Sequence, residues 1–119
     1  MYADLLIGRT KKFALDSIRF FQRLPKTEEA RILGKQLLRS STSVACNYRA
    51  ANRARSKQEF YSKICIVVEE IDETLFWLEL ITDAGITIKE TSEVIIKEAQ
   101  ELLYVFSATK KTTKDSLNK

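Results

Sequence analysis

The sequence predicts an all-α protein, folded as an antiparallel up-down four-helix bundle. Glycine occurs three times and proline once in 119 residues, whereas domains rich in strands need many turns. Apolar residues recur at steps of three and four along four long segments, as they do on the buried face of a helix. The connections between these segments are short, which makes consecutive helices antiparallel neighbours.

The first helix is expected over residues 4–24 and the second over residues 28–54. Leu24 precedes Pro25, and a residue before proline avoids the α region, so the first helix ends there. Thr27 can then accept a hydrogen bond from the first turn of the second helix. The expected buried stripe of the second helix consists of Ala30, Leu33, Leu37, Ser41, Val44, Tyr48 and Ala51.

The third helix is expected to begin near Lys57 and to end near Ala84. Ser56 and Glu59 have the spacing of a capping box, in which each residue satisfies a free backbone N–H of the first turn. Gly85 follows at the position where helices commonly close in a left-handed conformation. The expected buried stripe consists of Phe60, Ile64, Val67, Ile71, Leu75, Leu78 and Thr82.

The fourth helix is expected to start after a second capping box, Thr87 to Glu90, and to end near Ser107. Its expected inward residues are Ile88, Ile95, Ala99, Leu102 and Phe106. Residues 109–119 are polar, basic and without an apolar period, which is typical of a frayed terminus. We therefore expect a bundle over residues 1–108 and a flexible basic tail over residues 109–119.

The third helix carries more apolar side chains than one buried face requires. The surplus residues are Cys65, Ile66, Val68, Phe76, Trp77, Leu80 and Ile81. Burying a large apolar side chain contributes about 1.5–3 kcal/mol, so leaving several in water is costly. The pattern predicts self-association, with Phe76, Trp77 and Ile81 at the oligomer interface.

Charge is unevenly distributed behind the net value of +4. Residues 26–58 hold eight basic and two acidic side chains, whereas residues 59–83 hold one basic and seven acidic side chains. One interpretation is ion pairing between the second and third helices, because buried charges are normally paired. The residues expected in this structural polar network are Arg39, Ser43, Asn47, Glu69, Glu70 and Glu73, with Arg49 as a further candidate.

The other interpretation is a phosphate-binding rim at the end of the second helix. Four basic side chains fall within nine residues there: Arg49, Arg53, Arg55 and Lys57. Lysine and arginine clusters of this kind bind nucleic-acid phosphates. Arg9, Lys11 and Lys12 are further candidates for the same surface. The sequence leaves both interpretations open.

Several kinds of chemistry have no residues to support them. The chain contains no histidine, which removes serine and cysteine triads and most zinc sites. Its two cysteines, Cys46 and Cys65, lack the CxxC spacing, and its three glycines form no phosphate loop. We expect no enzymatic activity, no catalytic residue, no metal and no cofactor. We also expect no membrane span, because no apolar stretch approaches the roughly 20 residues needed, and a cytoplasmic location.

Three segments carry a resemblance to a known family: residues 36–51 (QLLRSSTSVACNYRAA), 54–60 (ARSKQEF) and 68–79 (VEEIDETLFWLE). They resemble four-helix-bundle proteins related to those encoded in intervening sequences of bacterial large-subunit rRNA. This family is similar in fold to the accessory variability determinant of diversity-generating retroelements. The resemblance implies a homopentameric ring, nucleic-acid binding as in the retroelement protein, and no enzymatic activity. The segment Tyr48 to Ala51 departs from the Glu-Gly pair that many members carry.

Together these patterns predict a non-enzymatic, oligomeric helical bundle that acts as a nucleic-acid-associated accessory protein, with RNA or DNA as partner. The alternative is a protein–protein interaction scaffold that binds no nucleic acid and uses the surplus apolar residues of the third helix.

Overall fold

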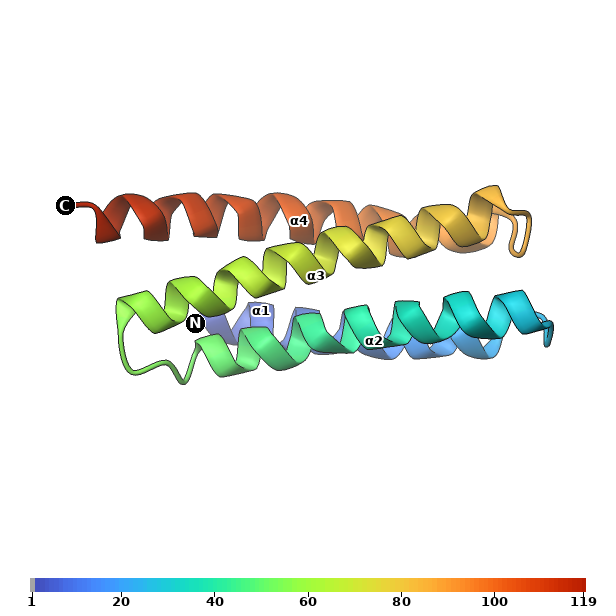
Figure 1. The fold of residues 1–119 in the computed structure, drawn as a ribbon, viewed down its shortest axis with the longest axis horizontal. Coiled ribbons are helices and arrows are strands. Elements are labelled where there is room, and N and C mark those ends of the chain that lie inside the picture. The colour runs from blue at the N-terminus through green and yellow to red at the C-terminus, as the bar shows by residue number, and fades with distance from the viewer. Residues whose placement is uncertain (1) are drawn as a thin grey trace.

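The computed structural model describes residues 2–119 and contains four long helices (Figure 1). They are α1 (Tyr2–Gln22), α2 (Glu28–Ala51), α3 (Lys57–Asp83) and α4 (Lys89–Leu117). Within residues 2–119 there is no strand, and the all-α prediction is confirmed. The helices form an elongated body with extents of 50 × 23 × 20 Å.

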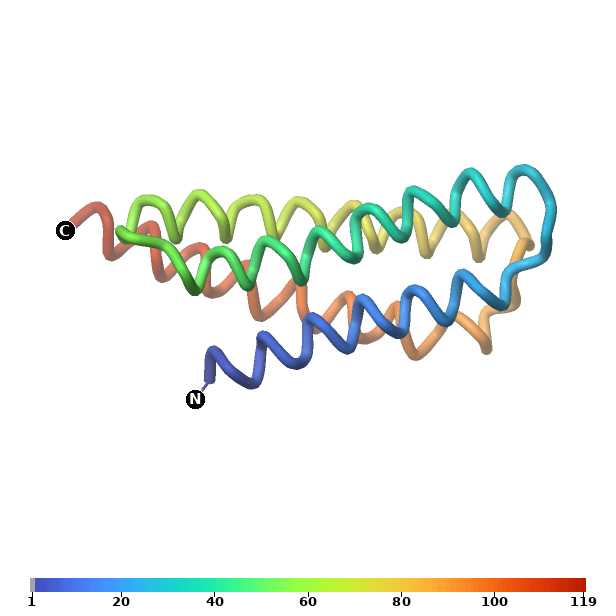
Figure 2. Tube along the Cα trace, turned by 90° about the horizontal axis from the view of Figure 1, so that it is seen from below, coloured from blue at the N-terminus to red at the C-terminus, as the bar shows by residue number. Residues whose placement is uncertain are grey.

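The helices follow the predicted up-down order. Each helix packs along the next one in the chain, and the largest interface is the one between α2 and α3. In Figure 1, α1 and α2 form one layer and α3 and α4 the other. The interface between α1 and α4 is the smallest, because α1 diverges from α4 toward its N-terminus (Figure 2). The antiparallel four-helix bundle is therefore confirmed, with its α1–α4 side less tightly closed than the others.

The core residues of α3 follow a strict alternation of three-residue and four-residue steps. They are Ile64, Val67, Ile71, Thr74, Leu78 and Ile81. This alternation averages 3.5 residues per turn, which keeps one face toward the neighbouring helices of a gently supercoiled bundle. The buried stripe expected from the sequence included Leu75 and Thr82, which lie beside this face and are only half-buried. Thr74 and Ile81 are buried in their place.

Two of the three predicted N-caps are confirmed. The hydroxyl of Thr27 accepts from the backbone N–H of Ala30 (3.3 Å), and that of Ser56 accepts from the backbone N–H of Glu59 (3.1 Å). The predicted role of Gly85 is also confirmed: its φ is +74°, and Ile86 N–H donates to the carbonyl of Ile81 (3.1 Å). This pattern closes the last turn of α3.

The predicted cap at Thr87 is wrong. The residue at the N-cap of α4 is Ile88, whose side chain makes no capping hydrogen bond. Because Ile88 precedes the first turn of the helix, its side chain is exposed and does not face inward as expected. A different contact connects the helices at this end of the bundle. The Thr82 hydroxyl on α3 donates to the hydroxyl of Ser92 in the first turn of α4 (2.8 Å).

Two predicted helix ends are also corrected. α2 ends at Ala51, three residues before the expected Ala54. α4 continues to Leu117, well past the expected end near Ser107, so residues 109–117 are helical in the structure. The hydroxyls of Thr109 and Thr113 donate to the backbone carbonyls of the residues four positions earlier, at 3.0 and 2.7 Å. No helix within residues 2–119 is both long and apolar enough to cross a membrane.

Gly34 lies where α2 approaches the end of α1 too closely for a side chain. A Cβ added there would lie 2.4 Å from Cδ1 of Phe21, whereas a Cβ on Gly8 meets nothing within 4 Å. We expect Gly34→Ala to lower the free energy of unfolding by about 1 kcal/mol, because overpacking outweighs the gain in helix propensity. Gly8→Ala, the matched control in an exposed helical position, should raise it by about 0.5–1 kcal/mol. Urea unfolding of both variants checks this, and two gains of equal size would contradict the close α1–α2 contact.

Candidate functional site

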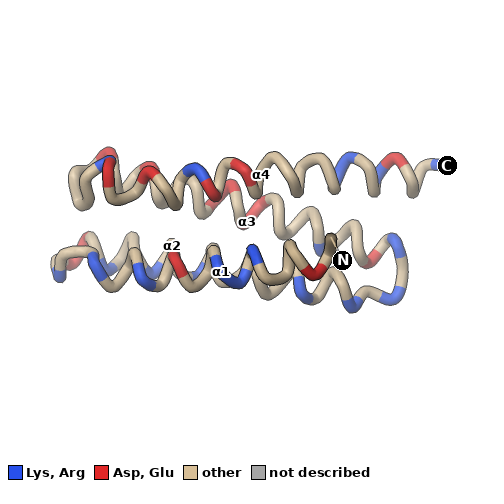
Figure 3. Tube along the Cα trace, turned by 180° about the vertical axis from the view of Figure 1, so that it is seen from behind, with Lys and Arg blue, Asp and Glu red and all other residues tan. Residues whose placement is uncertain are grey.

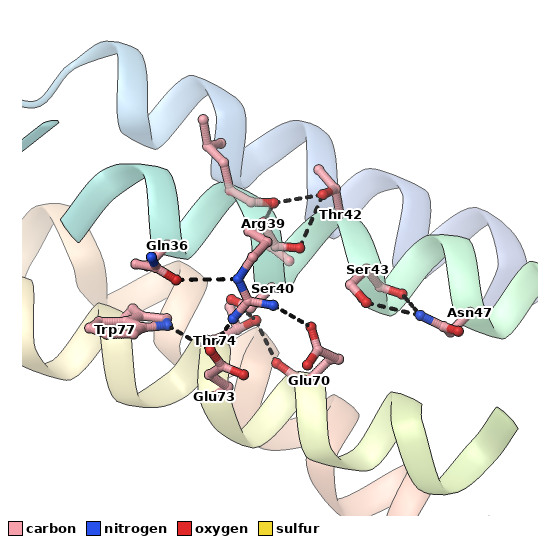
Figure 4. A network of polar contacts seen from close by, with 12 residues as sticks. Gln36, Arg39, Ser40, Thr42, Ser43, Asn47, Glu70, Glu73, Thr74 and Trp77 are labelled. Carbon is pink, nitrogen blue, oxygen red and sulfur yellow. Dashed lines mark hydrogen bonds and ion pairs between the residues drawn. The ribbon is translucent and has the colours of Figure 1, made fainter. Parts of the chain in front are cut away.

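An ion-paired network joins the middle of α2 to α3 (Figure 4). Arg39 on α2 pairs with Glu70 (3.3 Å between Nη1 and Oε2) and with Glu73 on α3. Gln36 accepts from Nε of Arg39 (3.2 Å), and Trp77 donates from its indole to Glu73 (3.4 Å). These contacts confirm the pairing that the sequence suggested for Arg39, Glu70 and Glu73. The guanidinium of Arg39 is thus already engaged by two carboxylates of α3.

Beneath this network, small polar residues allow α2 and α3 to approach closely. The Thr74 hydroxyl donates to the hydroxyl of Ser40 (2.8 Å), and both side chains are buried. Thr74 also lies within hydrogen-bond distance of the Glu70 carbonyl (2.7 Å). Among residues 2–119, no buried side-chain nitrogen or oxygen lacks a partner. The buried hydroxyls of Ser40 and Thr74 are therefore satisfied within the protein.

Three residues predicted for this network lie apart from it. The Asn47 amide donates to the carbonyl and hydroxyl of Ser43 (3.0 and 2.9 Å), so this pair bonds within α2 and does not reach α3. Glu69 is exposed and forms no ion pair within residues 2–119. The expectation that all six residues form one network is corrected for Ser43, Asn47 and Glu69.

A second network, which sequence reasoning missed, joins α1 to α4. Arg9 donates from Nε and Nη2 to the two carboxylate oxygens of Glu98 (2.8 and 2.7 Å) and from Nη2 to Glu101 (2.9 Å). The hydrogen bond to Glu98, together with the two negative charges, raises the pKa of the Arg9 guanidinium. Arg9 is therefore held by carboxylates, which counts against its predicted place on a phosphate-binding rim. No spacing in the sequence relates residues so far apart.

The remaining basic candidates gather where α2 ends. We call Arg49, Arg53, Arg55 and Lys57 the α2 rim. All four are exposed, and none forms an ion pair with a carboxylate of residues 2–119. Lys57 donates from Nζ to the hydroxyl of Ser116 (2.9 Å). The expected pairing of Arg49 with the acidic helix is therefore absent.

A shallow groove continues the rim onto α1. Lys11, Arg49 and Arg53 line it together with Asn52, and Asp4 is its acidic member. Lys12, the last of the basic candidates, lies elsewhere and pairs with Asp16 (2.8 Å). Of the three α1 candidates, Lys11 alone joins the rim.

The predicted oligomer interface is partly wrong. Ile81 has no exposed surface and belongs to the core, because the 3.5-residue repeat turns it inward. Phe76 is 53% exposed and packs edge-to-face against the half-buried Trp77 (ring centroids 5.1 Å apart). Phe76 and Trp77 thus remain available, and Ile81 does not.

No cluster of potential metal ligands occurs in the part of the chain that the structure describes. Both cysteines are free; Cys65 is half-buried and Cys46 is exposed.

The fold and these surfaces define a small all-α protein, a four-helix bundle braced by α2–α3 and α1–α4 ion pairs. Residues 6–108 match the family described as 23S rRNA-intervening sequence protein, and the chain belongs to this family. The family resemblance inferred from the sequence is confirmed.

A solved structure from Bacteroides thetaiotaomicron is similar over most of its length. It is described as a protein with unknown function from the S23 ribosomal protein family. It shares 28% sequence identity with a TM-score of 0.85, and the match covers 93% of this chain and 99% of that one. No curated protein matches the sequence.

Proposed function

We propose that this protein is a non-enzymatic accessory protein that binds the phosphodiester backbone of RNA or DNA through the α2 rim. The observation that carries the proposal is that Arg49, Arg53 and Arg55 are all exposed and form no ion pair with a carboxylate of residues 2–119. Arginines that already pair within the protein, such as Arg39, must break those contacts to bind phosphate. When phosphate binds the rim arginines, it displaces only water and counterions.

The distribution of charge supports the same surface. Residues 1–58 contain thirteen basic and four acidic side chains, whereas residues 59–107 contain three basic and eleven acidic ones. Figure 3 shows the basic residues concentrated on α1, α2 and the α2–α3 connection, and the acidic ones mainly on α3 and α4. A polyanion is therefore attracted to the α1–α2 side and repelled by most of the other layer.

The test is the salt dependence of binding to duplex RNA and duplex DNA, measured by fluorescence anisotropy. Each phosphate contact contributes about −0.9 to the slope of log K against log salt, so Arg49→Ala/Arg53→Ala/Arg55→Ala should flatten the slope by about 2.7. At 0.1 M salt this corresponds to a loss of roughly 10²-fold to 10³-fold in affinity.

The matched control removes three exposed basic residues at the opposite end of α2: Lys26→Ala/Arg31→Ala/Lys35→Ala. This variant has the same net charge as the rim variant, so equal losses in both would assign the effect to overall charge and reject the rim. No binding by the unaltered protein at about 50 mM salt would reject the proposed function altogether.

A second candidate function is self-assembly, and the exposure of Phe76 favours it. Phe76 and Trp77 form an apolar patch on the outer face of α3. Ile66, about three turns earlier on the same helix, is also partly exposed. A homo-oligomer would cover this patch, and the family resemblance leads us to expect a pentamer. Assembly is compatible with nucleic-acid binding, because it uses α3 and leaves the α2 rim free.

A further inference from the structure

The last turns of α4 reach the end of the bundle that carries the α2 rim. Ser116 lies near the end of α4 and accepts from Nζ of Lys57, at the start of α3 (2.9 Å). In Figure 1 the C-terminus of α4 lies at the same end as the α2–α3 connection and extends beyond it. Residues 109–119 lie outside the part of the chain that matches the family, residues 6–108.

These turns add positive charge to an end that is already basic. Residues 109–119 hold Lys110, Lys111, Lys114 and Lys119 against a single acidic residue, Asp115. Lys110, Lys111 and Lys114 form no ion pair with a carboxylate of residues 2–119. Helical structure fixes their spacing, whereas a frayed tail would present them in no defined arrangement.

We propose that Lys110, Lys111 and Lys114 form a second arm of the phosphate-binding surface, and that the α2 rim and this arm hold one double-stranded nucleic acid together. This inference rests on the proposed function and assigns its ligand class. The bundle is 23 × 20 Å in cross-section. A duplex carries one charge per about 1.7 Å of axis, so roughly 12 phosphates span such a face. A duplex laid across this end of the bundle therefore presents phosphates over the whole width between the arms.

The side chains around the lysines favour a duplex over a single strand. Proteins that bind single strands without sequence preference stack the bases on aromatic side chains. Neither arm contains an aromatic residue. The exposed tyrosines beside α4, Tyr2 and Tyr104, line a separate groove with Thr112 and Thr113 that includes none of the three lysines. The arms thus offer charged contacts to phosphates but no aromatic side chain on which an unstacked base could stack.

The same composition argues against an anionic membrane as the ligand. A helix that lies in a membrane surface combines basic residues with a face of large apolar side chains. Residues 109–117 include a single large apolar side chain, Leu117, which is half-buried, while threonine and serine supply most of the rest. These turns have charge for phosphates but no apolar face to insert.

The experiment compares Lys110→Ala/Lys111→Ala/Lys114→Ala with the unaltered protein and with the far-end control Lys26→Ala/Arg31→Ala/Lys35→Ala. Four probes are used: duplex RNA, duplex DNA, a single-stranded oligonucleotide, and vesicles containing phosphatidylserine. We expect the lysine variant to flatten the salt slope for duplexes by about 2.7 and to lose roughly 10²-fold to 10³-fold in affinity at 0.1 M salt. Circular dichroism should show an unchanged helix content, since the lysines are on the surface and alanine favours helix.

The outcomes separate this inference from the proposed function. If the unaltered protein binds duplexes and the lysine variant binds them equally well, the second arm is rejected and the α2 rim stands. Tighter binding to the single strand overturns the assignment to a duplex. Vesicle binding that depends on the lysines, without duplex binding, overturns both proposals, as does the absence of all binding.

Discussion

Replacing Phe106 with alanine is expected to lower the free energy of unfolding by about 3–5 kcal/mol, the range for emptying the site of a buried phenylalanine. Phe106 has no exposed surface, and its ring meets the ring of Tyr48 edge-on, with centroids 4.8 Å apart. This contact joins α4 to α2 across the core. Because α1 and α4 share the smallest interface, α4 depends on its inward face and on α3 for its position. A cavity at Phe106 should therefore weaken the whole fourth helix.

Urea unfolding, followed by circular dichroism at one fixed protein concentration, measures the loss. Tyr104→Ala is the matched control, because Tyr104 is 79% exposed on the same helix and its replacement should change stability by about 0.5 kcal/mol or less. If Phe106→Ala does not fold, Phe106→Leu retains most of the apolar volume and should show a smaller loss. Equal stability of the Phe106 and Tyr104 variants would mean that α4 does not pack on the core as described.

The inward position of Phe106 is an example of what the sequence could predict. Local spacing predicts that Phe106 lies on the buried face of the fourth helix, and the Ser56 to Glu59 spacing predicts a start of α3 near Lys57, where the helix begins. Both signals act within a few residues of the chain. The structure confirms them because neither depends on how distant segments meet.

Errors arose where small deviations accumulate or where tertiary contacts decide. A period slightly longer than 3.5 residues identifies the same buried face over two turns. Over the length of α3, however, the face expected from it rotates away from Thr74 and Ile81, which are buried in the structure. The pairing of Arg9 with Glu98 depends on the relative placement of α1 and α4, which no local pattern encodes. The end of α4 was missed because residues 109–117 have no apolar period, although their side chains are compatible with a helix.

The contrast between Arg39 and Arg49 follows from the register of α2 against α3. The hydrogen bond between Ser40 and Thr74 shows that these residues lie opposite each other. Because α2 and α3 are antiparallel, nine residues further along α2 correspond to nine residues earlier on α3, so Arg49 lies nearly level with Cys65. Residues 61–66 contain no carboxylate, because the acidic side chains of α3 lie almost entirely between residues 69 and 83. Arg39 therefore finds partners while Arg49 does not. The same register leaves Arg53 and Arg55 beyond the acidic part of α3, which is why positive charge collects at this end.

Phe76→Asp is expected to convert a homo-oligomer into a monomer of 13.7 kDa. The change removes an apolar contact worth about 1.5–3 kcal/mol for each copy and places a carboxylate where an interface would exclude water. Phe76 is the better choice than Trp77, whose indole donates to Glu73 within the Arg39 network, so that its loss would disturb the bundle itself. Because Phe76 is largely exposed in the single chain, its replacement should leave the folded monomer intact.

Sedimentation equilibrium at several concentrations distinguishes the two states. Tyr104→Asp introduces the same charge at a more exposed aromatic residue on α4, and it should leave the mass of the assembly unchanged. A monomeric unaltered protein at high micromolar concentration would remove the case for assembly, and so would a Phe76→Asp variant that retains the oligomeric mass. If Phe76→Asp gives monomers that still bind duplexes, but more weakly, the loss measures how much several α2 rims in one assembly add to the affinity of one.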